Sequence, residues 1–339
     1  MIRVVRLDVW TAPCFDEILA ASADVTLDVL ACDGDMERNW ALLSEAEIYH
    51  ITAARDEVPP HLLVSAELIS RCPKLKCVST SGAGYDTVDI RACSAAGILV
   101  VNQAGGNAQS VAEHALALML ALARRLPESA RRLRRRDGVA FTREDLMGNE
   151  IGGKTLGLVG IGHIGTRTAR LAAAFGMKVL ASDPYLDQQE IVARGAAPVS
   201  LEELLARSDI VSLHCPRTPE TLGLFNAKRF QQMKRGAYFV TTARGGIHNE
   251  VDLYQALLAG HLGGAGLDVW SVEPPPPDHP LLTLDNVVPT YHTAGVTHEG
   301  RRNVAALAAR QIVDICEGAA PARMVNPEIY PRFLAGFAA

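Results

Sequence analysis

Short apolar runs alternate with amphipathic stretches along the first third of the chain. The apolar runs have the length and the β-branched content of buried strands, and the stretches between them have helical spacing. The predicted strands cover residues 3–9, 25–30, 48–52, 75–80 and 98–102. The predicted helices cover residues 16–22, 41–47 and 65–72. This alternation predicts a small, parallel α/β domain.

The same alternation returns after a long apolar helix that ends near residue 126. Strands are predicted at 155–160, 178–182, 209–214, 237–241, 264–269 and 286–289. Helices are predicted at 166–175, 200–206, 227–234, 249–259 and, amphipathic and longer, 297–316. Six short strands with crossover helices predict a doubly wound sheet, whose ligands bind at the carboxyl ends of the strands.

One strand–turn–helix–strand unit, residues 155–183, carries a glycine pattern. Gly160, Gly162 and Gly165 have the spacing G-x-G-x-x-G, and Asp183 ends the second strand 18 residues after Gly165. In this pattern the glycines allow a tight turn, the approach of a pyrophosphate and close packing of the helix, whose N-terminus attracts phosphate. The acid bonds the ribose hydroxyls and repels a 2′-phosphate, and no arginine follows it directly. The unit therefore predicts a dinucleotide site that favours NAD over NADP.

Composition restricts the class of protein further. A chain of 339 residues is long enough for two domains, and a net charge of −5 gives no general attraction to nucleic acid or anionic membrane. The first residues lack the apolar core of a signal peptide, and no apolar run approaches the length of a membrane span. Seven cysteines without a C-x-x-C pair favour reduced thiols in the cytoplasm, and the histidines lack metal-ligand spacing, so no metal is expected.

Seven arginines crowd into a short segment after the long apolar helix. They are interrupted by Glu128 and Asp137, and no aromatic residues interleave with them, which favours a solvated helical face over a nucleic-acid patch. Their role stays open. They are Arg124, Arg125, Arg131, Arg132, Arg134, Arg135 and Arg136.

Three residues that can carry chemistry follow the later strands of the second domain. Arg244 lies in TTARGG, Glu273 in LDVWSVEPPPP and His292 in PTYHTAG. A planar arginine fork binds a carboxylate in a bidentate manner, a histidine can donate a proton near neutral pH, and an acid can orient that histidine. Each alone is more often structural, but all three at the ligand edge of one dinucleotide fold indicate an active site.

The motifs make the chain resemble the D-isomer-specific 2-hydroxyacid dehydrogenases, which include 3-phosphoglycerate, D-lactate and glyoxylate/hydroxypyruvate enzymes. SGAGYDTVDI, GNAQSVAEH, LGLVGIGHIG, LHCPRTPET, TTARGG, GAGLDVWSVEP and YHTAG occur in order over nearly the whole length. The resemblance implies a Rossmann-type NAD-binding domain, residues 105–298, inserted in a smaller, flavodoxin-like α/β substrate domain, residues 1–104 plus 299–339. It also implies an active site between the domains and a homodimer formed through the NAD-binding domain.

The resemblance assigns roles to individual residues. It implies that Arg244 binds the substrate carboxylate, that Glu273 supports His292, and that His292 is the general acid/base. It implies that a first-domain loop also binds the substrate, through the backbone of Ser81, Gly82, Ala83 and Gly84. The expected NAD contacts come from Gly160, Gly162, His163, Ile164, Gly165, Asp183, Cys215, Pro216, Thr221, Thr242, Ala243, Arg244, Asp268, His292, Ala294 and Gly295.

Differences between this sequence and related enzymes reduce the number of candidate substrates. Formate dehydrogenases have Gln in place of Glu273, and phosphite dehydrogenases have a lysine in the loop that contains Ala83, so formate and phosphite are disfavoured. Phosphoglycerate enzymes usually direct arginines at the phosphate, where Thr80 and Thr52 stand here, although Arg55 lies close to the second position. The chain also shows no appended regulatory domain, so phosphoglycerate stays open without being favoured.

The sequence thus predicts NAD-dependent, reversible interconversion of a D-2-hydroxyacid and its 2-oxoacid. The alternative is a corepressor-like protein that shares the fold, the glycine turn and the Arg–Glu–His set, and senses NADH without significant turnover. The absence of a visible partner-binding segment argues against it. The identity of the 2-hydroxyacid and the preferred reaction direction are not specified.

Overall fold

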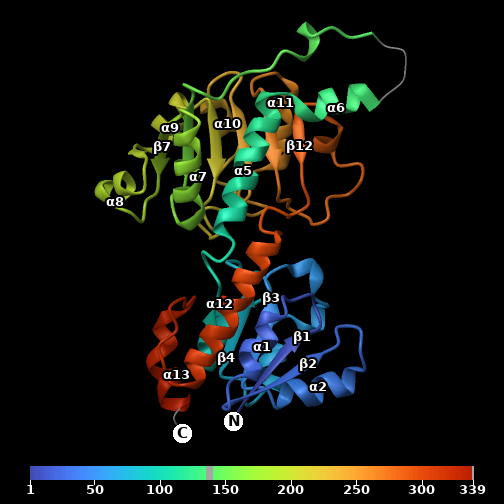
Figure 1. The fold of residues 1–339 in the computed structure, drawn as a ribbon, viewed down its shortest axis with the longest axis vertical. Coiled ribbons are helices and arrows are strands. Elements are labelled where there is room, and N and C mark those ends of the chain that lie inside the picture. The colour runs from blue at the N-terminus through green and yellow to red at the C-terminus, as the bar shows by residue number, and fades with distance from the viewer. Residues whose placement is uncertain (135–139, 338–339) are drawn as a thin grey trace. The chain divides into compact units, whose positions relative to one another are not determined.

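The structure is a computed structural model that describes residues 1–134 and 140–337 (Figure 1). It contains two compact units. Unit 1 consists of Met1–Asn107 and Val296–Ala339, and unit 2 consists of Ala108–Gly295. Unit 2 therefore interrupts unit 1 in the sequence. The functional division predicted above, after residue 104 and again before residue 299, stays a prediction.

Unit 1 is built on a five-stranded parallel sheet of order β2-β1-β3-β4-β5, the flavodoxin-like order. Its strands are β1 (Ile2–Leu7), β2 (Val25–Leu30), β3 (Ile48–Thr52), β4 (Cys77–Ser81) and β5 (Leu99–Val101). Its helices are α1 (Cys14–Ala20), α2 (Met36–Ser44), α3 (Ala66–Arg71), α4 (Ile90–Ala96), α12 (His298–Cys316) and α13 (Tyr330–Phe337). Short 3-10 turns cover Arg55–Glu57, Pro60–Leu62 and Pro327–Ile329.

Unit 2 is built on a seven-stranded parallel sheet of order β12-β11-β10-β9-β6-β7-β8. Its strands are β6 (Thr155–Val159), β7 (Lys178–Ser182), β8 (Ala197–Pro198), β9 (Ile210–Leu213), β10 (Tyr238–Thr241), β11 (Gly264–Leu267) and β12 (Val287–Pro289). Its helices are α5 (Ala108–Ala123), α6 (Leu126–Arg134), α7 (His163–Ala174), α8 (Gln188–Ala193), α9 (Leu201–Arg207), α10 (Ala227–Gln232) and α11 (Glu250–Leu258). Short 3-10 turns cover Glu144–Leu146 and Pro280–Thr283.

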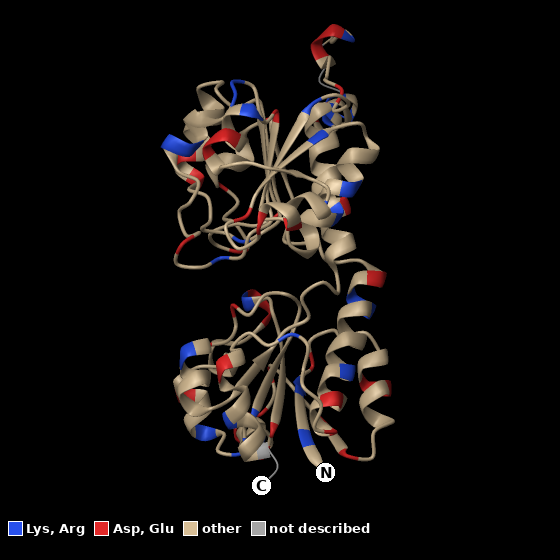
Figure 2. Ribbon diagram, turned by 90° about the vertical axis from the view of Figure 1, so that its left-hand side faces the viewer, with Lys and Arg blue, Asp and Glu red and all other residues tan. Residues whose placement is uncertain are grey.

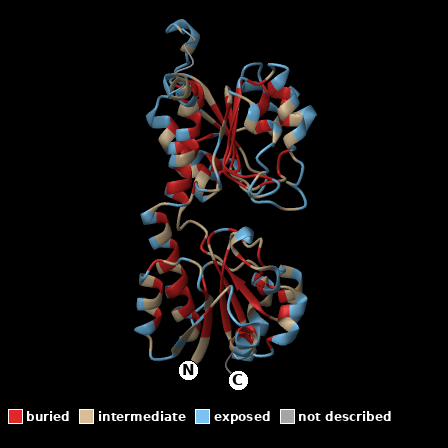
Figure 3. Cartoon of the chain, turned by 90° about the vertical axis from the view of Figure 1, so that its right-hand side faces the viewer, coloured by how far each residue is buried: buried red, intermediate tan, exposed pale blue. Residues whose placement is uncertain are grey.

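Each sheet is buried between helices whose outer faces are exposed (Figure 3). All residues of β3, β9 and β11 are buried, as expected for parallel strands covered on both faces. In unit 2 three phenylalanines, Phe225, Phe230 and Phe239, pack on one another with ring centroids 5.3–5.9 Å apart. Each such side chain contributes roughly 1.5–3 kcal/mol of hydrophobic stabilisation. On the surface, basic and acidic residues are interspersed over both units (Figure 2).

The sequence patterns missed several elements. The second sheet has seven strands, not six, because β8 has only two residues and so shows no periodicity. Helix α8 is short, although Asp187 and Glu190 form a capping box that marks its start. Helix α7 begins at His163 rather than at 166, because the last glycine of the turn already lies inside the helix. Helices α4 and α13 were not predicted, and α6 was predicted only as a solvated helical face without bounds. No helix in the described ranges is both long and apolar enough to cross a membrane.

Candidate active site

The glycine turn lies at the point where the strand order of unit 2 reverses. Strand β6 pairs with β7 on one side and with β9 on the other, which makes its carboxyl end the topological switch point. Gly160 has a φ of 88°, and a Cβ on it would lie 2.9 Å from the amide nitrogen of Cys215. A Cβ on Gly165 would lie 2.5 Å from the carbonyl oxygen of Gly160. These two glycines are therefore required by the packing of the turn.

Gly162 differs from the other two glycines. A Cβ built on it has nothing within 4 Å, and its φ of −71° is open to any residue. It is the N-cap of α7, and no side chain caps the helix there. A cavity of about 600 Å³ begins at Gly162 and His163 and continues along α7. The free space at Gly162 and the uncapped helix end fit a pyrophosphate.

Asp183 is connected to this turn by a hydrogen bond. Its Oδ2 accepts from the amide of Ile161 at 3.0 Å, and its Oδ1 accepts from the amide of Tyr185 at 3.1 Å. The carbonyl of the same Ile161 accepts from the Arg194 guanidinium at 2.9 Å. Arg194, with Arg167 and Arg170 of α7, lines the cavity beside Gly162. No motif indicated Arg194.

His292 and Glu273 form a hydrogen-bonded pair. His292 Nδ1 lies 2.8 Å from Glu273 Oε2, and the two side chains are 33% and 21% exposed. A carboxylate oxygen only accepts, so Nδ1 donates and Nε2 remains available to exchange a proton with a ligand. The backbone of His292 has a φ of 43°, a left-handed conformation that is rare for a histidine and common at functional sites.

Asp268 organises the loop that carries His292. Its side chain is fully buried and accepts from the amides of Thr293 and Ala294 at 2.9 and 3.0 Å. The Thr290 hydroxyl donates to Asp268 Oδ1 at 2.7 Å, and therefore accepts from His114 Nε2 at 3.0 Å. Ala294 and Asp268 are both expected to contact the cofactor, and the hydrogen bond between them holds the Ala294 backbone in place. Thr290 and His114 were missed, although GNAQSVAEH contains His114.

The loop after β11 also contacts the segment that contains Arg244. A Cβ on Gly245 would lie 1.8 Å from the carbonyl oxygen of Trp270, so only glycine fits beside that backbone. Arg244 is half-buried, and its guanidinium donates to the carbonyl of Ala243 at 2.7 Å. Thr242 is buried, and its Oγ1 has no hydrogen-bond partner in the described part of the chain. This unsatisfied hydroxyl fits a ligand atom at the carboxyl end of β10.

The segment after β9 begins with two half-buried side chains that are neutral at physiological pH. Burial lowers the pKa of His214 to about 4 and raises the pKa of the Cys215 thiol to about 11. His214 Nε2 lies 3.0 Å from the Ser212 hydroxyl. The loop then closes through Thr221, whose hydroxyl donates to the carbonyl of Pro216 at 2.7 Å. This side of the expected cofactor site therefore carries no charge from Cys215.

The expected substrate loop lies in unit 1, directly after β4. Its carbonyl groups are engaged within the unit: Gly82 O accepts from Gln103 N, Ala83 O from Asn102 Nδ2 and Gly84 O from the Thr80 hydroxyl. Within the described ranges, the amides of Ala83 and Gly84 donate to no acceptor. Two neighbouring free amides can bind a carboxylate. Thr80, like Thr52, is buried.

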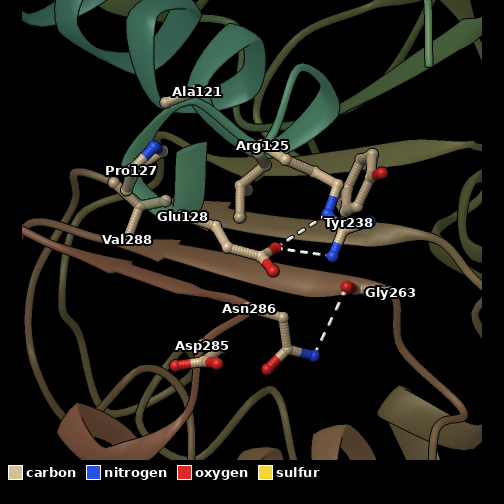
Figure 4. A pocket seen from close by; sticks show the side chains of 10 residues that line it. Ala121, Arg125, Pro127, Glu128, Tyr238, Gly263, Asp285, Asn286 and Val288 are labelled. Carbon is tan, nitrogen blue, oxygen red and sulfur yellow. Dashed lines mark hydrogen bonds and ion pairs between the residues drawn. The ribbon is translucent and has the colours of Figure 1, made fainter. Parts of the chain in front are cut away.

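A second cavity, of about 330 Å³, lies at the opposite end of the unit 2 sheet, where Tyr238 begins β10 (Figure 4). The arginine cluster contributes to it. Glu128, only 8% exposed, accepts from Arg125 and Arg132 at 2.8 Å, and Arg131 pairs with Asp285. The described residues contain five arginines of the cluster. Arg125, Arg131 and Arg132 have acidic partners, and Arg124 and Arg134 are exposed. Arg135, Arg136 and Asp137 lie outside the described residues.

Metal ligands were not expected from the sequence. Across residues 1–134 and 140–337, no three His, Cys, Asp or Glu side chains come together in a group that could hold a metal ion.

Comparison with known proteins identifies the family. Residues 116–294 match the family described as D-isomer specific 2-hydroxyacid dehydrogenase, NAD binding domain, and this segment lies within unit 2. D-3-phosphoglycerate dehydrogenase of Archaeoglobus fulgidus is 42% identical over 291 residues, which cover 86% of this chain and 54% of that protein. Glyoxylate reductase of Korarchaeum cryptofilum is 39% identical over 267 residues, 78% of this chain and 80% of that protein.

A solved structure agrees with the fold over both units. D-lactate dehydrogenase of Aquifex aeolicus, complexed with NAD and lactic acid, has a TM-score of 0.80 and 29% identity, over 95% of this chain and 98% of that one. The chain belongs to the D-isomer-specific 2-hydroxyacid dehydrogenase family, with an NAD-binding Rossmann domain inserted in a second α/β domain. It spans about half the length of the phosphoglycerate dehydrogenases it matches.

Proposed function

We propose that this protein is an NAD-dependent dehydrogenase that interconverts a D-2-hydroxyacid and its 2-oxoacid. The observation that carries the proposal is the 2.8 Å bond between His292 Nδ1 and Glu273 Oε2, in a domain of a hydroxyacid dehydrogenase family. The Aquifex relative was solved with lactic acid, a 2-hydroxyacid, which supports the substrate class.

The roles of the side chains follow from their chemistry. In reduction, the Arg244 guanidinium binds the substrate carboxylate. In unit 1, the free amides of Ala83 and Gly84 offer donors that suit a carboxylate as well. His292 donates the proton on Nε2 to the carbonyl oxygen, while Glu273 keeps Nδ1 bonded and the ring oriented. In oxidation His292 accepts that proton. Bound NADH supplies the hydride in reduction.

The cofactor proposal is NAD rather than NADP. The glycine turn and the first turn of α7 would hold the pyrophosphate, and Asp183 would accept from the adenosine ribose hydroxyls. The Asp183 carboxylate repels a 2′-phosphate. The unsatisfied hydroxyl of Thr242 and the residues Asp268 and Ala294 would surround the nicotinamide end.

The proposed function is tested with a panel of 2-oxoacids. NADH oxidation is followed with glyoxylate, hydroxypyruvate, pyruvate, phosphohydroxypyruvate and branched 2-oxoacids, and the chirality of each product is determined. We expect turnover of at least one member, with a D-hydroxyacid as product, and loss of that turnover in His292→Ala. Inactivity with the whole panel despite NADH binding would reject the proposal and favour an NADH-sensing corepressor-like protein.

A homodimer is part of the same proposal, because the family usually dimerises through its NAD-binding domain. Sedimentation velocity at micromolar concentration is expected to give the mass of two chains. A single species with the mass of one chain would contradict it.

A further inference from the structure

Two consecutive amides of one loop bind two different glutamates. The amide of Trp270 donates to Glu273 Oε1 at 3.0 Å, and the amide of Ser271 donates to Glu250 Oε1 at 2.7 Å. Glu273 uses its other oxygen for His292. Glu250 is the first residue of α11, so it ties this loop to a helix. The Trp270–Ser271 turn is therefore bonded to Glu273 through one amide and to Glu250 through the next. A shift of this turn would move Glu273.

The second oxygen of Glu250 is held by a histidine. Glu250 Oε2 lies 3.4 Å from His279 Nε2, and both side chains are only 15% exposed. The amide of Leu281 donates to His279 Nδ1 at 3.3 Å, so Nδ1 accepts and Nε2 carries the proton that faces Glu250. Glu250 and His279 thus form a second carboxylate–histidine pair behind the loop.

Trp270 connects this second pair to the loop of His292. The His279 ring packs edge-on against the Trp270 ring, with centroids 5.4 Å apart and an interplanar angle of 74°. The Trp270 indole donates to the carbonyl of Thr290 at 3.0 Å, two residues before His292. Trp270 is 3% exposed and packs in the hydrophobic core of unit 2, so it has little freedom to move.

We propose that Glu250 and His279 are positioning residues, which act on the reaction by holding the Trp270–Ser271 turn and thereby Glu273 in contact with His292. This inference rests on the proposed function of His292. Without Glu250, the Ser271 amide loses its acceptor and the turn can shift. Misplacement of a catalytic group by about 1 Å can cost about 100-fold in rate.

Three variants of α11 separate this role from a general effect on folding. Glu250→Ala removes the acceptor and is expected to lower kcat for 2-oxoacid reduction by about 10-fold or more, with NADH affinity within about 2-fold. Glu250→Gln keeps an oxygen for Ser271 but sets an N–H donor against the His279 Nε2 proton, so kcat is expected to fall less than in Glu250→Ala. Asp252→Ala is the matched control, because Asp252 lies in the same helical turn but bonds the amide of Ala227 at 2.9 Å. It is expected to leave kcat unchanged.

A double-mutant cycle tests whether Glu250 acts through Glu273. In a Glu273→Gln background, adding Glu250→Ala is expected to lower kcat by less than about 2-fold, because the bond that Glu250 protects is already altered. If the two losses multiply instead, Glu250 acts independently of Glu273 and the inference is wrong. If Glu250→Ala does not fold, His279→Leu takes its place in the cycle, with the same expectation.

A second measurement does not require turnover. We expect the proton shared by His292 Nδ1 and Glu273 to give a downfield proton NMR signal, which is assigned by its loss in His292→Gln. We expect the signal to shift or broaden in Glu250→Ala and to persist in Glu250→Gln and Asp252→Ala. An unchanged signal in Glu250→Ala would overturn the positioning role. If the signal responds as expected but no 2-oxoacid is reduced, the proposed function fails and the positioning role stands.

Discussion

Each nitrogen of the His292 imidazole has a separate task in the proposed reaction. Nδ1 donates to Glu273, which fixes the ring, and Nε2 exchanges the proton with substrate. Asp268 stabilises the backbone on either side of this histidine, since it accepts from Thr290 and from the amides of Thr293 and Ala294. Substitution of the ring should therefore remove the acid/base without disturbing the loop.

His292→Ala is expected to reduce turnover by about 100-fold to 10,000-fold, the usual contribution of a general acid. NADH binding, measured by fluorescence titration, is expected to persist. His61→Ala, which changes an exposed histidine of unit 1, is the control. Normal turnover in His292→Ala would exclude the acid/base role.

Asp183 has two functions that two substitutions can separate. Asp183→Ala removes both the acceptor for Ile161 N and the negative charge, and is expected to weaken NADH binding by about 10-fold while relaxing discrimination against NADPH. Asp183→Asn keeps an oxygen for Ile161, so it is expected to relax discrimination with a smaller loss of NADH affinity. The measurement is kcat/KM for NADH and NADPH. A wild-type protein that already prefers NADPH would refute this interpretation of Asp183.

At the scale of elements, the glycine turn and α7 can be tested residue by residue. Gly162→Ala adds a methyl group to open space, so the melting temperature should change little while NADH binding weakens. Gly165→Ala forces a methyl group against the Gly160 carbonyl, and should cost about 1–3 kcal/mol of folding stability. Differential scanning fluorimetry with and without NADH distinguishes the two effects. Equal destabilisation by both substitutions would show that Gly162 is a packing residue.

Elements with clear periodicity were predictable, and short or locally capped ones were not. Strands β2, β3 and β7 were predicted with their exact bounds, because each is a run of five or six residues in which β-branched and other apolar side chains predominate. Strand β8 and helix α8 are too short to show a period. The residues of the proposed site follow strands and belong to motifs, which made them visible in the sequence. Their supports, such as Glu250 and His279, are distant in sequence and meet only through the fold.

At the scale of the whole molecule, both units carry neutral histidines: His50 and His248 are buried, and His214 is half-buried. Burial lowers the pKa of His50 in unit 1 to about 3, and lowers the pKa of His214 and of His248 in unit 2 to about 4. In the unfolded chain a histidine binds a proton below about pH 6.5. Between about pH 6.5 and the lowered pKa of the folded protein, the unfolded chain binds more protons than the folded one. The free energy of unfolding therefore decreases as the pH falls through this range.

His248→Leu is expected to reduce this acid sensitivity. Neither ring nitrogen of His248 has a hydrogen-bond partner among the described residues, so leucine removes no bond. Between pH 7 and pH 5 the wild type should lose about 2 kcal/mol more than the variant, as measured by urea unfolding. His61→Leu is the control at an exposed position. If the free energy of unfolding falls equally with pH in His248→Leu and in the wild type, the prediction is wrong.

The left-handed backbone of His292 sets stability and activity against each other at one position. The left-handed conformation destabilises a residue that has a Cβ by about 1 kcal/mol, and it does not destabilise glycine. In a library selected for heat resistance alone, glycine should therefore accumulate at position 292, and those survivors would be inactive. Selection for turnover is what keeps a histidine at position 292. The frequency of histidine among variants selected only for heat resistance therefore measures how much stability this active-site residue costs.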